Sequence, residues 1–145
     1  MANAVFNYFK TAVMQGSYNL ASFPIYCALV NNSYAAAVDV DNHKYWGQID
    51  GTYEISGTAY VAGGAALSNP AVTQDDTDNE GVFDADDCIW GTSTITAAGA
   101  IIYGSSGLGA DSDPMVCFID FTEDKSSVTG KFTIQWNAEG ILNIT

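Results

Sequence analysis

The chain has 145 residues, of which 17 are Asp or Glu, four are Lys, none is Arg and one is His, so its formal net charge is −13. Nucleic acids and anionic membranes are bound by clustered Lys and Arg, whereas these four lysines are scattered singly. The composition therefore argues against nucleic acid and membrane partners. The missing Arg clamp for carboxylate and phosphate also argues against an enzyme that acts on anionic metabolites. The length predicts a single domain over residues 1–145.

The first predicted element is an N-terminal helix within residues 1–16. Phe6, Phe9 and Val13 recur at the spacing of one helix face, so that face is expected to be buried. Gly16 is suited to end the helix in a left-handed conformation.

A buried strand is expected next, at residues 25–30, because apolar side chains occupy both of its faces. Residues 31–51 then lose all periodicity and carry Asn, Asp and Gly, which predicts a long irregular surface loop. Loops of this length are often functional or form interfaces.

Short strands separated by turn residues follow from residue 52 to the end. Residues 130–137 show the clearest alternation, with Phe132, Ile134 and Trp136 on the face expected to be buried. The spacing predicts a mainly β fold, a two-sheet antiparallel sandwich of jelly-roll type with one N-terminal α-helix. The expected strands are 52–56, 65–74, 81–84, 87–90, 94–104, 115–122, 130–137 and 140–144.

The three cysteines, Cys27, Cys88 and Cys117, fall in apolar strand-like segments. We expect all three to be reduced core residues, because a free Cys behaves as a small hydrophobe. Neither a secretory signal nor a membrane-spanning run is recognisable, so synthesis in the cytoplasm is expected.

An acidic segment at residues 76–87 has the spacing of a twelve-residue calcium loop, with Gly81 at the position of the sharp turn. The candidate calcium ligands are Asp76, Asp78, Glu80, Asp84 and Asp87. Two features argue against a calcium loop. Its last ligand position holds Asp87 instead of the usual Glu, and the flanking sequences predict strands rather than helices. The alternative is a solvated acidic hairpin, and no other cofactor is expected.

Aromatic residues in the loop at residues 31–51 form the second candidate site. We expect Tyr34, Tyr45 and Trp46 to lie on the surface and to make an interface, with a homodimer favoured and a trimer next. His43 lies in the same loop, but no nucleophile elbow or paired carboxylates accompany it, so the protein is not expected to be an enzyme.

Several segments of the chain form a recognisable set. They are residues 1–3 (MAN), 25–30 (IYCALV), 32–34 (NSY), 54–65 (EISGTAYVAGGA), 82–87 (VFDADD) with Trp90, 118–121 (FIDF) and 132–142 (FTIQWNAEGIL). Together these segments resemble a family of small structural proteins of tailed bacteriophages. The resemblance covers nearly the whole chain and rests on scaffold motifs rather than catalytic ones.

This resemblance implies a capsid cement or decoration protein. Such a protein is made in the host cytoplasm, binds the outer face of the head shell and stabilises contacts between subunits of the major capsid protein. The alternative is a tail, baseplate or head-fibre β-module for host attachment that binds carbohydrate.

Overall fold

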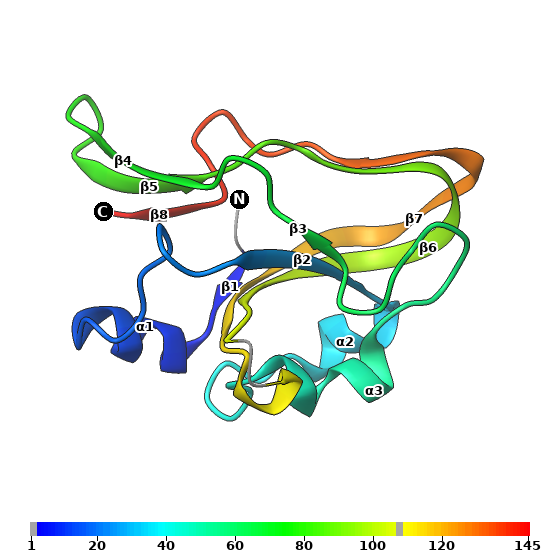
Figure 1. The fold of residues 1–145 in the computed structure, drawn as a ribbon, viewed down its shortest axis with the longest axis horizontal. Helices are drawn as coiled ribbons and strands as arrows, with labels where there is room; N and C mark the ends of the chain where they lie inside the picture. Colours follow the sequence, from blue (N-terminus) through cyan, green and yellow to red (C-terminus); the bar gives the residue numbers. More distant parts are fainter. Residues whose placement is uncertain (1–2, 107–108) are drawn as a thin grey trace.

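The computed structural model describes residues 3–106 and 109–145. Strands dominate it, and the helices are short (Figure 1). In chain order the elements are β1 (Ala4–Val5), α1 (Asn7–Met14), β2 (Ile25–Val30), α2 (Asn32–Ala37), the 3-10 helix η1 (Trp46–Gln48), α3 (Asp50–Tyr53), β3 (Ala65–Ala66), β4 (Ala71–Asp75), β5 (Glu80–Asp84), β6 (Cys88–Gly104), the 3-10 helix η2 (Ala110–Ser112), β7 (Met115–Ile134) and β8 (Leu142–Ile144).

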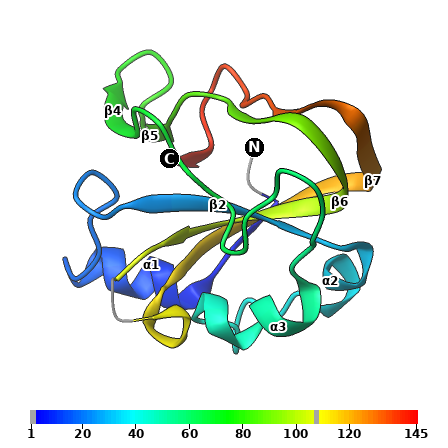
Figure 2. The same ribbon diagram turned by 45° about the vertical axis from the view of Figure 1, so that its right-hand side comes forward.

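The strands form two antiparallel sheets, with the orders β1-β7-β6-β2-β3 and β4-β5-β8. Strands β6 and β7 are long and bend together, so that their paired halves run through both layers of the molecule (Figures 1 and 2). The predicted mainly β fold of two antiparallel sheets with an N-terminal helix is confirmed. The five-plus-three strand arrangement does not establish a jelly-roll connectivity, which stays a prediction.

Strand β2 lies inside the larger sheet, between β6 and β3, and five of its six residues are buried. This burial confirms the prediction that residues 25–30 form a strand buried on both faces. At the other end of the chain, Phe132, Ile134 and Trp136 are buried while Thr133 and Gln135 are exposed, as their alternation predicted.

The N-terminal helix is shorter than predicted. Ala4 and Val5 pair with β7 instead of starting the helix, because a short strand there covers part of the edge of β7. Helix α1 ends at Met14, and Gly16 follows it in the expected left-handed conformation. Gly16 has a φ of 69° and donates its N–H to the carbonyl of Val13 at 3.0 Å. Ser17 N–H bonds to the carbonyl of Ala12 at 2.9 Å, which completes a Schellman motif.

The prediction that residues 31–51 form an irregular loop is wrong, because much of this segment is helical. This segment contains α2 and η1 and the start of α3, which lie against one face of the larger sheet (Figure 1). Asn31 caps α2 by accepting a hydrogen bond from Ser33 N–H at 3.1 Å. The strand expected at residues 52–56 is likewise replaced by the end of α3 and a single bridge between Val30 and Glu54.

Two pairs of predicted strands are each part of one longer strand. Residues 87–90 and 94–104 belong to β6, and residues 115–122 and 130–137 fall largely within β7. Register shifts in the β6–β7 ladder, which mark β-bulges, explain the error, because they interrupt the alternation without ending the strand.

All three cysteines are buried and free, as predicted. Burial raises the pKa of the Cys117 thiol to about 12, so this side chain stays a protonated apolar group at physiological pH.

The close approach of the segment before β3 to β2 predicts a large effect at Gly64. A Cβ there would lie 2.1 Å from the carbonyl oxygen of Cys27, and its φ of 78° disfavours a side chain. We expect Gly64→Ala to lower the free energy of unfolding by about 3 kcal/mol, from the clash and the strained backbone together. Gly51→Ala in α3, where a Cβ meets nothing within 4 Å, should be neutral or slightly stabilising in the same urea titration. Equal effects of the two substitutions would contradict the close packing at Gly64.

Candidate functional site

Two of the three aromatic residues expected at an interface are core residues instead. Tyr34 is 0% exposed, and its ring meets that of Phe118 edge-on with centroids 5.2 Å apart. Trp46 is 3% exposed and stacks on Tyr103 at 5.2 Å. The expectation of a surface position is therefore wrong for Tyr34 and Trp46, because the short helices of this segment turn their aromatic side chains toward the sheet.

Tyr45 is the member of the set that reaches the surface. It is half-buried, and its ring lies 5.2 Å from that of Tyr8 on α1. The hydrogen bond between the two side chains, followed by partial burial, raises the pKa of Tyr8. The pair borders a pocket of about 270 Å³ that Phe23 and Pro114 also line. This pocket joins α1 to the segment before β7 and is the first candidate contact surface.

His43 is held in a structural hydrogen-bond network. Its Nδ1 accepts the N–H of Asp39 at 3.2 Å and lies 3.2 Å from the hydroxyl of Tyr34. The carboxylate of Asp39 bonds instead to the backbone and side chain of Asn42, and these bonds lower the pKa of Asp39. The imidazole therefore holds the turn before η1 against the core.

The five candidate calcium ligands lie along an extended hairpin. Asp76 and Asp78 are in its turn, Glu80 and Asp84 are at opposite ends of β5, and Asp87 follows that strand. An extended strand rises about 3.3 Å per residue, so Glu80 and Asp84 lie roughly 13 Å apart. Three of the carboxylates have protein partners. Asp76 accepts from the Gln74 amide, Glu80 from the Asn143 amide at 2.6 Å and Asp87 from the backbone N–H of Trp136 at 3.0 Å. Within the described residues, no group of three or more His, Cys, Asp or Glu side chains could hold a metal ion.

This geometry makes the calcium hypothesis directly testable. A ligand that binds only the native state at a hundredfold excess over its Kd would stabilise it by about 2.7 kcal/mol. Because the five carboxylates are spread along the hairpin, we expect the melting temperature to be the same in millimolar calcium and in a chelator. A rise of several degrees that Asp76→Ala with Asp78→Ala abolishes would instead support calcium binding.

A partly buried hydrogen-bond network around Glu54 was missed from the sequence. The Glu54 carboxylate accepts hydrogen bonds from the Tyr60 hydroxyl at 2.8 Å and from Gly63 N–H at 2.5 Å. The Tyr60 oxygen in turn accepts the N–H of Leu29, and Tyr103 donates to the carbonyl of Gly63 at 2.7 Å. The sequence around Glu54 shows no periodic pattern that would have predicted this network. The network ties residues 54–63 to the larger sheet.

Burial raises the pKa of Glu54, and its two hydrogen bonds offset only part of that shift. Because the folded pKa lies above the unfolded one, the contribution of Glu54 to stability is fully present below its ordinary pKa of 4.5. It is lost as the pH rises through the folded pKa.

Glu54→Gln keeps an oxygen that can accept both hydrogen bonds and removes the titration. We therefore expect the free energy of unfolding of Glu54→Gln, relative to wild type, to increase as the pH rises from 4 to 7. Urea titrations across this range measure the difference. Glu139→Gln, at an exposed position, removes the same charge and should show no such trend.

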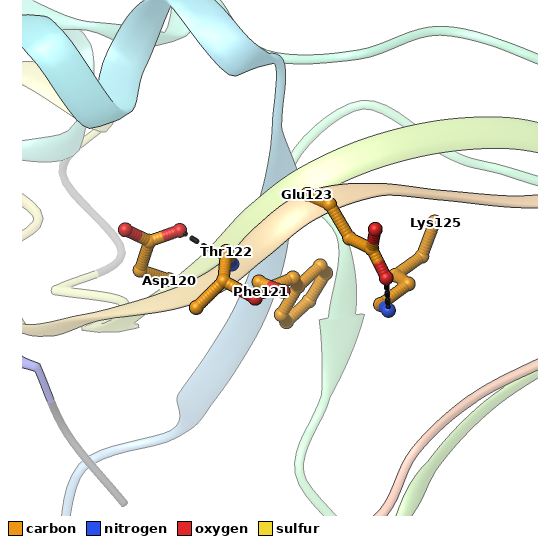
Figure 3. Close-up of polar contacts among 5 residues, drawn as sticks. All are labelled: Asp120, Phe121, Thr122, Glu123 and Lys125. Atoms are coloured by element: carbon orange, nitrogen blue, oxygen red, sulfur yellow. Dashed lines mark hydrogen bonds and ion pairs between the residues drawn. The ribbon is translucent and has the colours of Figure 1, made fainter.

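A hollow of about 600 Å³ lies at the bend of β7. It is lined by residues on both sides of the bend, including Phe121, Lys125 and Lys131. Figure 3 shows the bend itself, where Thr122 N–H donates to Asp120 at 2.8 Å and Lys125 pairs with Glu123. This groove therefore holds two of the four lysines of a strongly acidic chain.

Comparison of the chain with protein-family models, with curated proteins and with solved structures gave no match. Among the described residues, no helix is long and apolar enough to cross a membrane. The candidate surfaces are thus defined by their geometry, namely the pocket beside Tyr8 and Tyr45 and the groove at the bend of β7.

Proposed function

We propose that this protein is a non-enzymatic structural protein of a tailed bacteriophage, a cement or decoration protein that binds the outside of the head shell. In this role it stabilises contacts between neighbouring subunits of the major capsid protein. The resemblance of segments spread over the whole chain to small phage structural proteins supports the proposal. The alternative of a tail, baseplate or head-fibre module is distinguished from it by experiment below.

The observation that carries the proposal is the half-buried aromatic pair Tyr8 and Tyr45, which borders a pocket of about 270 Å³. Tyrosines at partly exposed positions are favoured as interface anchors, because they bury a large apolar area and keep a polar tip. Trp46, the next residue in the chain, is buried against Tyr103, and the buried Tyr34 contacts His43, so both hold the segment that carries Tyr45.

The polar groups characterised above are consistent with a binding role. His43 and Glu54 are held in hydrogen bonds that position loops against the sheet. A net charge of −13 keeps many copies of a small protein apart before assembly, because like-charged molecules repel one another.

The role in the shell is tested with phage particles that lack the protein. We expect such particles to package DNA but to burst at a lower temperature than wild-type particles, and wild-type virions to contain hundreds of copies by quantitative gel densitometry. Particles that match the wild type in heat stability but fail to adsorb to host cells would contradict the proposal and favour the attachment alternative.

The contact surface is tested with single substitutions in the purified protein added back to these particles. Tyr45→Ala should weaken shell binding by roughly 2 kcal/mol or more per site, because interface energy is concentrated in desolvated aromatic residues. Lys125→Ala, which removes an exposed ion pair, should bind almost as wild type does. Trp46→Ala is unsuitable as a probe of binding, since removal of a buried indole should destabilise the fold. Equal binding of the Tyr45 variant and the wild type would place the contact surface elsewhere.

A further inference from the structure

The outer strands among the described residues are β1 and β3 in the larger sheet and β4 and β8 in the smaller sheet, and β4 is the longest of the four. Strand β7 has a second long open edge. Residues 3–6 bond to it only between Val116 and Asp120, and no strand of the described residues neighbours it beyond them. Unpaired edges present rows of backbone N–H and C=O groups that can pair with another chain.

The edge at β4 lacks the usual protection against such pairing. Four of its five residues are exposed, Val72 is 52% exposed, and no lysine interrupts residues 71–75. Val72 lies opposite Phe83, a core residue, and therefore lies on the face of the sheet that points toward the core.

The edge at β7 is accessible because the groove of about 600 Å³ lies along it. Residues 131–135 line this groove, with Phe132 and Ile134 facing the core and Lys131, Thr133 and Gln135 exposed. Lysine on a strand edge disfavours pairing with most strands, but it favours a strand that places a carboxylate opposite.

The two edges are complementary in an antiparallel register. With Asp75 opposite Lys131, Thr73 lies opposite Thr133 and Val72 opposite Ile134. Opposite charges, threonine pairs and pairs of β-branched residues are all favourable across strands. The faces also agree, because Val72 and Ile134 both lie on the core side of their sheets.

Because the two edges are complementary, the occupant that fits each of them is the other edge of a second copy. Strands β4 and β7 lie at opposite sides of the layer that contains β5 and the first half of β6 (Figure 2), so the two edges of one molecule do not meet. We propose that copies of this chain associate head to tail, with β4 of one copy pairing antiparallel with residues 131–135 of the next.

This mode differs from a twofold homodimer, in which the same patch of both copies would meet. A head-to-tail contact leaves one free β4 and one free β7 edge at the ends of every open assembly, and it closes only as a ring. A pairing of about five residues is small compared with a stable interface, so we expect association only at roughly 100 µM protein or when copies are held on a common surface. The inference does not depend on the proposed function, because purified protein alone tests it.

Cysteine cross-linking distinguishes the two modes. Thr73→Cys and Thr133→Cys place one exposed thiol on each edge, while the native cysteines are buried. In 0.15 M salt, where charge repulsion is screened beyond about 8 Å, an equimolar mixture with oxidised glutathione should form disulfide dimers at least roughly tenfold faster than either variant alone.

Thr73→Cys mixed with Thr11→Cys, whose thiol lies on α1, is the matched control and should stay at the background rate. Fast dimer formation by Thr73→Cys alone would overturn the proposal in favour of symmetric pairing of β4 with β4. A rate in the Thr73 and Thr133 mixture equal to that of the control mixture would also overturn it.

Charge variants provide a second, independent readout. Lys131→Glu places two carboxylates opposite each other and should raise the dissociation constant roughly tenfold in sedimentation equilibrium. Lys10→Glu on α1 changes the net charge by the same amount and should leave the constant within about twofold. Equal effects of the two variants, each confirmed as folded by its melting curve, would show that net charge rather than the β4–β7 contact controls association.

Discussion

The pairing of β6 with β7 is the interaction on which the rest of the structure depends. These strands contain 17 and 20 residues, and they stay paired from the Tyr103–Met115 end to the Cys88–Ile134 end. Because the pair bends through both layers, it provides two inner strands of the larger sheet and also reaches the layer that holds β4, β5 and β8. The bend requires a residue without a side chain at Gly99, where a Cβ would lie 2.5 Å from the Phe118 ring and 2.7 Å from the carbonyl of Ile119.

The aromatic packing follows from this bent pair. Tyr103 lies near the end of β6 and Phe118 near the start of β7. Their rings provide the surface against which Tyr34 and Trp46 are buried. An irregular loop over residues 31–51 would leave many backbone groups without partners against the sheet. The short helices satisfy some of these groups internally, and bonds such as Trp46 N–H to the carbonyl of Asp113 satisfy others. The segment between β2 and β3 therefore folds into helices because the sheet offers an aromatic face that needs covering.

The parts of the fold that were predictable from sequence are those governed by local periodicity. The alternation of apolar and polar residues correctly predicted the burial of Phe132, Ile134 and Trp136. The two apolar faces of residues 25–30 correctly predicted a buried strand, and Gly16 correctly predicted where α1 ends. The continuity of β6 and β7 was not predictable, because β-bulges break the alternation. The burial of Tyr34 and Trp46, like the contacts of Glu54, depends on tertiary partners distant in sequence, which leave no local pattern.

The same bend also explains why the protein presents open edges. Bending the β6–β7 pair separates the two halves of the outer edge of β7, and β1 covers only the part next to Cys117 and Phe118. Between the halves lies the groove that contains Phe121 and two of the four lysines. In a chain of net charge −13, general repulsion opposes contact between copies, so contact requires a place where positive charge and unpaired backbone coincide. The bend of β7 provides both, which makes it the surface where the strand architecture and the charge distribution together favour association with another strand.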